Sequence, residues 1–387
     1  MDPHPDPALL RTADRMAEAA QAWLHTLDAE QRAVAVGAVP GSAADAERLR
    51  WFYTPTDHGG LTLHQQRPAQ QRRAMALVAS GLSEAAYVTV ATVLGLENVL
   101  DRTEGFVATF GRERGRDPGL YYLRVFGEPG GAAPWAWRFG GHHVSVNVLV
   151  VDGRVAATTP LFLGADPASS PLLGGAVLRP LGAVEDLARD LVRSLDPDLA
   201  ATALLLPRAP SDIVAGNRSR VSAGDRVLPL TGVWRGPFAD PDEQAKLQKM
   251  SDAIDDTAGL DDADHRAVAL TDAPRGVPAS ALDAGQRERL RALLGCYLDR
   301  VPAGVSPLPR YAPTPDGEAA LDAVHLAWAG STVPGEPHYY RLQGPRLLLE
   351  WDNTQRQVNH AHSVWRDPEA DFGLDVLGEH RQQHHAH

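Results

Sequence analysis

The chain has 387 residues and a formal charge of -12 at pH 7. Its only lysines are Lys246 and Lys249, so no basic stripe can neutralise a phosphate backbone, and we expect no nucleic-acid partner. A composition of 44% hydrophobic and 22% charged residues, with 35 glycines and 30 prolines, predicts a globular α+β protein with many turns between short elements.

The first thirty residues carry acidic and proline residues where a signal peptide needs a basic segment and a continuous apolar segment. No stretch approaches the roughly twenty apolar residues of a membrane-spanning helix. We therefore expect a cytoplasmic protein without a membrane partner. The single cysteine, Cys296, lies in the apolar-periodic run RLRALLGCYL and is interpreted as a core residue rather than a nucleophile.

In chain order, the pattern predicts an N-terminal helical segment over residues 1–45, in which Asp28 caps the second helix. A first α+β half follows over 46–206 and includes a helix at 184–195. The second half, 207–387, begins with a turn-rich polar stretch and ends in a His-rich tail.

An internal repeat relates the two halves. The segment from Leu123 to Asn147 aligns without gaps to the segment from Leu326 to Glu350, and glycines, a proline and an arginine recur at matching positions. Upstream, the helical run that begins at Gly60 parallels the run that begins at Gly276. Chance similarity is the alternative, because glycine, proline and arginine are abundant in this chain.

The repeat predicts an α+β fold of two pseudo-repeated halves, each with a helix and an antiparallel β-hairpin, after an N-terminal helical leader. In the first half the hairpin turns at Asp152 and Gly153, a pair suited to type I′ geometry. Carried over by the repeat, the second hairpin would turn near Gln355 and Arg356.

Four histidines accompany these hairpins. With the predicted turns, His142 falls on the strand face of Val144, and His360 and His362 fall on the face of Leu349 and Trp351. His143 falls on the opposite face of the first hairpin, and Glu350 and Asp352 lie on the opposite face of the second. A bulge or a one-residue slip would exchange the two sets.

We expect His142, His143, His360 and His362 to bind a divalent transition metal. Imidazoles with a nearby carboxylate suit iron, copper, zinc or manganese, and the sequence does not choose among iron, copper and zinc. The alternative is that these histidines are hydrogen-bonded structural residues, which is the commoner fate of a single histidine. Four further histidines lie in the tail: His380, His384, His385 and His387.

Three residues are candidates for catalytic roles. Glu350 would serve as a ligand or general base, Arg366 would hold a substrate carboxylate or phosphate, and Asp367 would orient a ligand histidine or act as a base. An internal contact between Arg366 and Asp367 is equally consistent with the sequence. The chain lacks a nucleophile elbow, a phosphate-binding loop and a dinucleotide fingerprint, which disfavours serine hydrolases, nucleotide hydrolases and dinucleotide enzymes.

The motifs Trp-x-Trp-Arg, Gly-His-His and His-x-His-x-x-x-Arg-Asp-Pro resemble a family catalogued as a domain of unknown function with the number 3500. The resemblance extends over most of the chain, from RWFYTPTDHGGLTL to NHAHSVWRDPEADFGLDVL. It implies a shared fold and a shared site, without an established reaction.

From these patterns we expect a metal-dependent enzyme that acts on a small polar or acidic metabolite. Oxygen-using redox chemistry is favoured slightly over hydrolysis, because mixed histidine and carboxylate sets on strands are common in iron and copper oxygen chemistry. The alternative is a non-catalytic metal- or ligand-binding protein in which the histidines are structural. The sequence leaves the oligomeric state open.

Overall fold

The computed structural model describes residues 7–235 and 241–377, so the four tail histidines lie outside it. Contacts group the described residues into two compact units, one made of 7–161, 299–306 and 369–377 and the other of 162–235, 241–298 and 307–368. These groups differ from the predicted halves, because 162–206 belong with the second unit. In this stretch β7 (Leu161–Ala165) hydrogen-bonds to β15 (Ala361–Arg366), and β10 (Leu204–Leu206) pairs with β12 (His325–Gly330), so its strands belong with those of the second unit.

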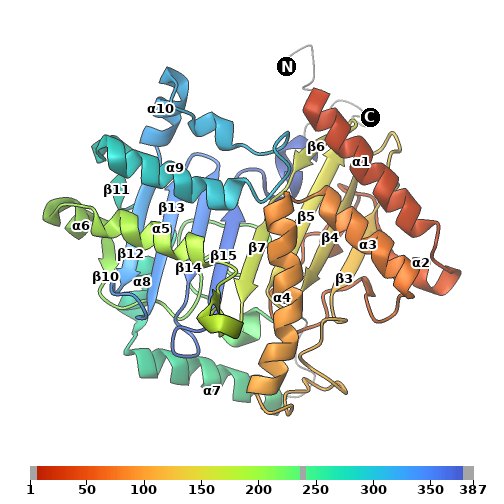
Figure 1. Ribbon diagram of the computed structural model, residues 1–387, viewed down its shortest axis with the longest axis horizontal. Coiled ribbons are helices and arrows are strands. Elements are labelled where there is room, and N and C mark those ends of the chain that lie inside the picture. Colours follow the sequence, from red (N-terminus) through yellow and green to blue (C-terminus); the bar gives the residue numbers. More distant parts are fainter. Residues whose placement is uncertain (1–6, 236–240, 378–387) are drawn as a thin grey trace. The chain divides into compact units, whose positions relative to one another are not determined.

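The first unit combines helices with short strands. Its helices are α1 (Pro7–Leu24), α2 (Ala29–Ala35), α3 (Pro68–Ser80) and α4 (Glu84–Thr103). Its strands are β1 (Val36–Gly37), β2 (Leu61–Thr62), β3 (Tyr122–Phe126), β4 (Trp135–Gly141), β5 (Val144–Val151) and β6 (Arg154–Ala157). The sheet order is β1-β3-β4-β5, with β2 on β3 and β6 on β5, and α1 packs against α3 on one face of it (Figure 1).

One buried glutamine fixes the start of α3. Pro68 occupies the first turn, where its missing N–H costs no helical hydrogen bond. The side chain of Gln70 accepts from the backbone N–H of Arg67 at 2.8 Å and donates to the carbonyl of Thr26 at 2.7 Å. The same side chain therefore caps α3 and ties it to the turn between α1 and α2.

The second unit has a larger set of elements. Its helices are α5 (Gly182–Arg193), α6 (Pro197–Ala203), α7 (Pro241–Ala258), α8 (Asp262–Val268), α9 (Ala284–Leu298) and α10 (Pro315–Asp322). Its strands are β7, β8 (Ser170–Pro171), β9 (Val177–Leu178), β10 (Leu204–Leu206), β11 (Val277–Pro278), β12 (His325–Gly330), β13 (His338–Gly344), β14 (Leu347–Asp352) and β15. The order is β7-β15-β14-β13-β12-β10, with β11 on β12 and β8 paired with β9 apart. The fold is therefore α+β, as the sequence predicts.

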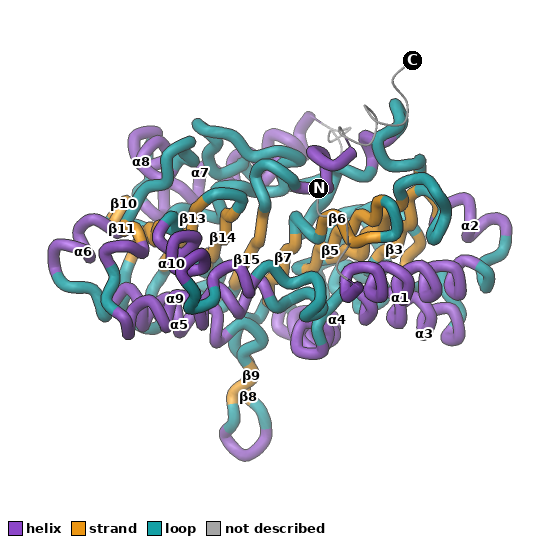
Figure 2. Tube along the Cα trace, turned by 90° about the horizontal axis from the view of Figure 1, so that it is seen from above, coloured by secondary structure: helices purple, strands orange, loops and turns teal. Residues whose placement is uncertain are grey.

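Helices cover both faces of the strands of the second unit. Figure 2 shows α5 and α9 on one face and α7 and α8 on the other. Because strand residues alternate between faces, Tyr340 points to the first face and its neighbours to the second. The hydroxyl of Tyr340 lies 2.8 Å from that of Tyr297 in α9 and donates to the carbonyl of Val184 in α5 at 3.0 Å. Tyr340 therefore faces α5 and α9, and its neighbours in β13 lie on the face covered by α8.

The first-hairpin histidines do not lie in a strand. Gly141 pairs with Val144, so His142 and His143 form the two-residue turn between β4 and β5, with His143 at φ 62°. The predicted assignment of His142 to the face of Val144 is therefore wrong, because turn residues do not follow strand alternation. The next turn has positive φ at both Asp152 and Gly153, as type I′ geometry requires.

The second hairpin also differs from the prediction. β14 ends at Asp352 and β15 begins at Ala361, so the connection is longer than a two-residue turn. Asp352 pairs with His362, which places His362 on the face of Asp352 rather than on that of Leu349 and Trp351. The predicted face is therefore wrong, because an odd shift in register exchanges the two faces of a strand. None of the described helices combines the length and apolar character that a membrane crossing requires.

A substitution at Gly276 tests whether the backbone just before β11 requires a glycine. It has φ 98°, and a methyl group there would overlap the carbonyl oxygen of Leu326 in β12. We expect Gly276→Ala to lower the free energy of unfolding by clearly more than Gly335→Ala, measured by urea denaturation. Gly335 also has positive φ (81°) but open space around it, so its variant should lose only the 1–2 kcal/mol, roughly, of a strained backbone. Equal losses would mean that the overlap is relieved by local movement.

Candidate metal centre

Three acidic or imidazole side chains of the second unit meet on the sheet face covered by α8. Asp352 ends β14 and His362 lies opposite it in β15. Asp352 also pairs with Tyr339 in β13, and Tyr339 lies on the face away from Tyr340. Asp212, from the loop after β10, completes the cluster.

The three groups are close and shielded from solvent. One ligand atom from each of Asp212, Asp352 and His362 lies within 4.8 Å of the others, and all three residues are buried. The Nδ1 atom of His362 lies 2.7 Å from Oδ1 of Asp212. Metal bonds of about 2 Å allow ligand atoms to be about 4 Å apart, so a small inward movement would let this set hold one ion.

Asp352 has one buried oxygen without a hydrogen-bond partner. Its Oδ1 accepts from the backbone N–H and the hydroxyl of Thr354, at 3.2 and 3.1 Å. Its Oδ2 is buried and has no hydrogen-bond partner, although Asp352 is only 1% exposed. Burial and then the carboxylate of Asp212 raise the pKa of Asp352 well above its usual value. A cation at Oδ2 would remove both penalties.

Glu350 holds the loop that carries Asp212. Its Oε1 accepts from the backbone N–H of Val214 at 2.8 Å and from the hydroxyl of Tyr339 at 2.6 Å, and its Oε2 accepts from Ala215 N–H at 2.9 Å. Val214 and Ala215 in turn belong to the apolar core beside Tyr339. Burial is the main cause that raises the pKa of Glu350. These contacts give Glu350 a positioning role beside the cluster.

His360 stands next to this cluster. Its ring centre is 4.6 Å from that of His362, with the two rings nearly perpendicular. The Nδ1 atom of His360 lies 3.7 Å from Oδ2 of buried Asp166, and Asp166 also contacts Nε of Arg356 at 2.9 Å. His360 is therefore a second imidazole beside His362, with Asp166 as its nearest printed carboxylate.

In the first unit, the rings of His142 and His143 have centres 3.8 Å apart and planes tilted by 30°. The Nδ1 atom of His142 lies 2.6 Å from Oε1 of Glu97 in α4, and a guanidinium nitrogen of Arg116 lies 3.4 Å from the ring. A carboxylate at this position orients a ligand imidazole in many metal sites. The prediction that histidines of both repeats share one ion concerns both units and stays a prediction.

Arg366 and Asp367 are the two remaining residues for which the sequence predicts a catalytic role. Arg366 is fully buried in β15, opposite Leu348. Asp367 contacts Arg346 through Oδ2, at 2.9 Å from Nε and 2.8 Å from a terminal nitrogen. Its observed partner is therefore an arginine of the β13–β14 turn. From the sequence, Asp352 belongs with Glu350 to the alternative set of nitrogen and oxygen ligands on the opposite strand face.

Sequence reasoning missed Asp212, Asp166 and Glu97. Asp212 and His362 are separated by 150 residues, and Asp212 lies in a turn-rich stretch without periodicity. Glu97 occupies a helix where a carboxylate usually faces solvent. No local signal marks any of the three, because their role comes from tertiary contacts.

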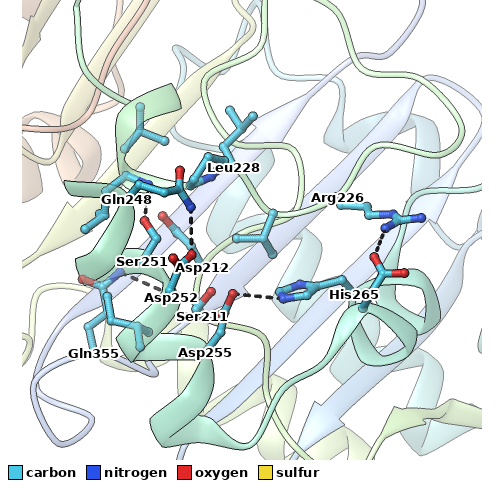
Figure 3. A pocket seen from close by; sticks show the side chains of 16 residues that line it. Ser211, Asp212, Arg226, Leu228, Gln248, Ser251, Asp252, Asp255, His265 and Gln355 are labelled. Atoms are coloured by element: carbon cyan, nitrogen blue, oxygen red, sulfur yellow. Dashed lines mark hydrogen bonds and ion pairs between the residues drawn. The ribbon is translucent and has the colours of Figure 1, made fainter. Parts of the chain in front are cut away.

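A pocket leads to the cluster. Asp212 lines a cavity of about 280 Å³ together with side chains of α7 and α8. Figure 3 shows Asp212 near Asp252 and Ser211, with Asp255 and His265 joined by an ion pair. Asp212 therefore connects the buried cluster to space that a small molecule can enter.

The fold and this site define an α+β protein with a candidate His/Asp metal centre. Residues 10–374 match the family described as "Protein of unknown function (DUF3500)", so the chain belongs to this family and the resemblance noted from the motifs is confirmed. A search of curated proteins and a search of solved structures each found no match. The family description names no activity, so a function must be argued from the site.

The variant Asp352→Asn tests how much the burial of the ionised Asp352 carboxylate destabilises the folded protein. The folded-state pKa of Asp352 is raised above 3.8, so the stability associated with its protonated form is present below pH 3.8 and lost as pH rises through the folded-state pKa. The asparagine variant lacks this loss and keeps the acceptor for Thr354. We expect the metal-free variant to be more stable than the metal-free wild type at neutral pH, with the difference shrinking toward about pH 4. Urea denaturation at several pH values measures this, and a variant less stable at neutral pH would contradict it.

Proposed function

We propose that the second unit binds one divalent transition metal through Asp212, Asp352 and His362, with His360 as the adjacent imidazole. The observation that carries this proposal is the buried Oδ2 of Asp352, which has no hydrogen-bond partner and lies in a cluster with Asp212. An unpaired buried carboxylate oxygen is costly, and a cation offsets that cost.

The donor set fits borderline metals. Two carboxylates and one or two imidazoles, without a thiolate, suit iron, zinc or copper. We favour iron and oxygen-using redox chemistry over zinc-dependent hydrolysis, because imidazole and carboxylate ligands on strands are the donor set of non-haem iron enzymes. The bound ion would supply Lewis acidity at the end of the pocket.

The protein groups around the ion would have separate tasks. Glu350 positions Asp212 through the backbone of Val214 and Ala215. The pocket beside Asp212 would receive a small polar metabolite. A general-base role for Glu350 or Asp367, and a substrate-binding role for Arg366, stay predictions from the sequence.

We also propose that the two units arose by duplication of one α+β element. The strand pairs support this. Tyr122 pairs with Gly140 and His325 with Gln343, and both members of the second pair lie 203 residues later (325 − 122 and 343 − 140). The β4–β5 pair Gly141 and Val144 recurs as Gly344 and Leu347 with the same difference.

The metal proposal is tested by elemental analysis of untagged protein in which the tail histidines His384, His385 and His387 are replaced. We expect about one ion per chain, lost in His362→Ala and in Asp212→Asn, because each variant removes one of three ligands. Asp352→Asn should lose the ion while becoming more stable without it, since it removes the unpaired carboxylate.

The matched control is His25→Ala, an exposed histidine of the first unit, which should keep the ion. His142→Ala, His143→Ala and His360→Ala in the same assay test the remaining predicted ligands. Wild-type protein that binds no iron, zinc or copper after dialysis against each ion would refute the proposal. Metal binding without turnover or oxygen consumption would instead favour a non-catalytic binding protein.

A further inference from the structure

The pocket beside Asp212 continues into a larger one. A second cavity of about 820 Å³ is lined by the loop after β10, by α7 and by the loop after β14. The two cavities share Ser211, Ile254 and Gln355 in their linings. The two cavities therefore adjoin each other beside α7, and Asp212 of the candidate metal centre lines the first. We call the two cavities together the cleft.

The end at the metal centre is rich in carboxylates. The acidic residues among its described lining are Asp212, Asp252, Asp255 and Asp262, against Arg226 and His265. Arg226 pairs with Asp262 at 2.6 Å and His265 with Asp255 at 3.0 Å. Asp252 accepts from the neutral amide of Gln248 at 2.9 Å, which leaves its charge unbalanced (Figure 3).

A further unpaired acceptor lies at this end. The Oδ1 atom of Asp255 is buried and has no hydrogen-bond partner. With Asp252, it offers carboxylate oxygens to a ligand even when Asp212 and Asp352 are taken up by a metal ion. A protonated amine satisfies such acceptors, whereas a carboxylate or phosphate would be repelled.

The far end of the cleft has the opposite character. Its described lining contains Arg208 and Arg356 and no aspartate or glutamate. Arg208 contacts Asp264 at 2.9 Å and Arg356 contacts Asp166 at 2.9 Å, and both carboxylates lie outside the lining. The guanidinium side chains are 49% and 37% exposed, so a ligand anion in the cleft can reach both.

We propose that this cleft binds an elongated zwitterion, with its amine at Asp252 and Asp255 and its carboxylate at Arg208 and Arg356. The inference that this zwitterion is a substrate rests on the proposed metal function. The separation of charge between the two ends of the cleft does not depend on the ion. It narrows the substrate class from small polar or acidic metabolites to amino acids with separated charged ends or short peptides. A uniformly acidic metabolite would place one anion against the aspartates.

Three probes of similar length separate the alternatives by isothermal titration calorimetry: ε-aminocaproate, adipate and hexamethylenediamine. We expect ε-aminocaproate to bind most tightly, because it alone matches both ends. Adipate binding most tightly, equal binding of all three, or no binding of ε-aminocaproate at millimolar concentration would overturn the proposal.

Variants assign the two ends. Arg208→Gln should weaken binding of ε-aminocaproate and adipate about tenfold, and Asp252→Asn should weaken binding of ε-aminocaproate and hexamethylenediamine by a similar factor, since each removes one charge-assisted hydrogen bond. The controls are Asp256→Asn, on α7 but outside the lining, and Arg289→Gln, an exposed arginine of α9. Losses equal to those of the controls would refute the assignment.

The titrations are made on metal-loaded and on metal-free protein, with metal content measured in each sample. Selective binding of ε-aminocaproate by a chain that loads no ion would support the cleft and refute the metal proposal. A chain that loads one ion but does not prefer ε-aminocaproate would refute the cleft proposal and leave the metal centre standing.

Discussion

The pairing of Asp352 with His362 is the constraint on which the candidate centre depends. It places a carboxylate and an imidazole side by side on the sheet face that α8 covers, away from solvent. Had the strands paired one residue differently, His362 would face α5 and α9, where tyrosines and apolar residues fill the space. The grouping of these side chains therefore follows from one strand register, which is held by the antiparallel pairing of β13, β14 and β15.

Two carboxylates that lie two residues apart, Glu350 and Asp352, are both buried but differ in their hydrogen-bond partners. Glu350 is surrounded by two backbone N–H groups and a tyrosine hydroxyl, so its two oxygens have partners. Asp352 has partners at one oxygen only. Burying a polar group is tolerated when it is hydrogen-bonded. Glu350 thus stabilises the loop of Asp212, while Oδ2 of Asp352 is a buried acceptor without a hydrogen-bond partner, which is the observation behind the proposed metal site.

The two units carry different residues at corresponding strand positions. With the constant difference of 203, Glu350 corresponds to Asn147 and Asp352 to Leu149 (350 − 203 and 352 − 203). Asn147 donates to the carbonyl of Pro160, and Leu149 is a buried core residue. The carboxylate pair therefore belongs to the second unit alone, while the first unit has histidines at its hairpin turn. If the units share an ancestor, their surfaces have since been given different tasks.

The sequence by itself determined the family, the α+β class and the turn at Asp152 and Gly153, because these depend on motifs and on periodicity along a few residues. The tertiary structure alone decided that His142 and His143 form a turn and that His362 faces Asp352. Strand register is set by backbone hydrogen bonds between neighbouring strands. The sequence pattern does not reveal the register of β15 on β14, because the loop over residues 353–360 separates the two strands. Only the fold could bring Asp212 to His362 across 150 residues, since no local pattern records so distant a contact.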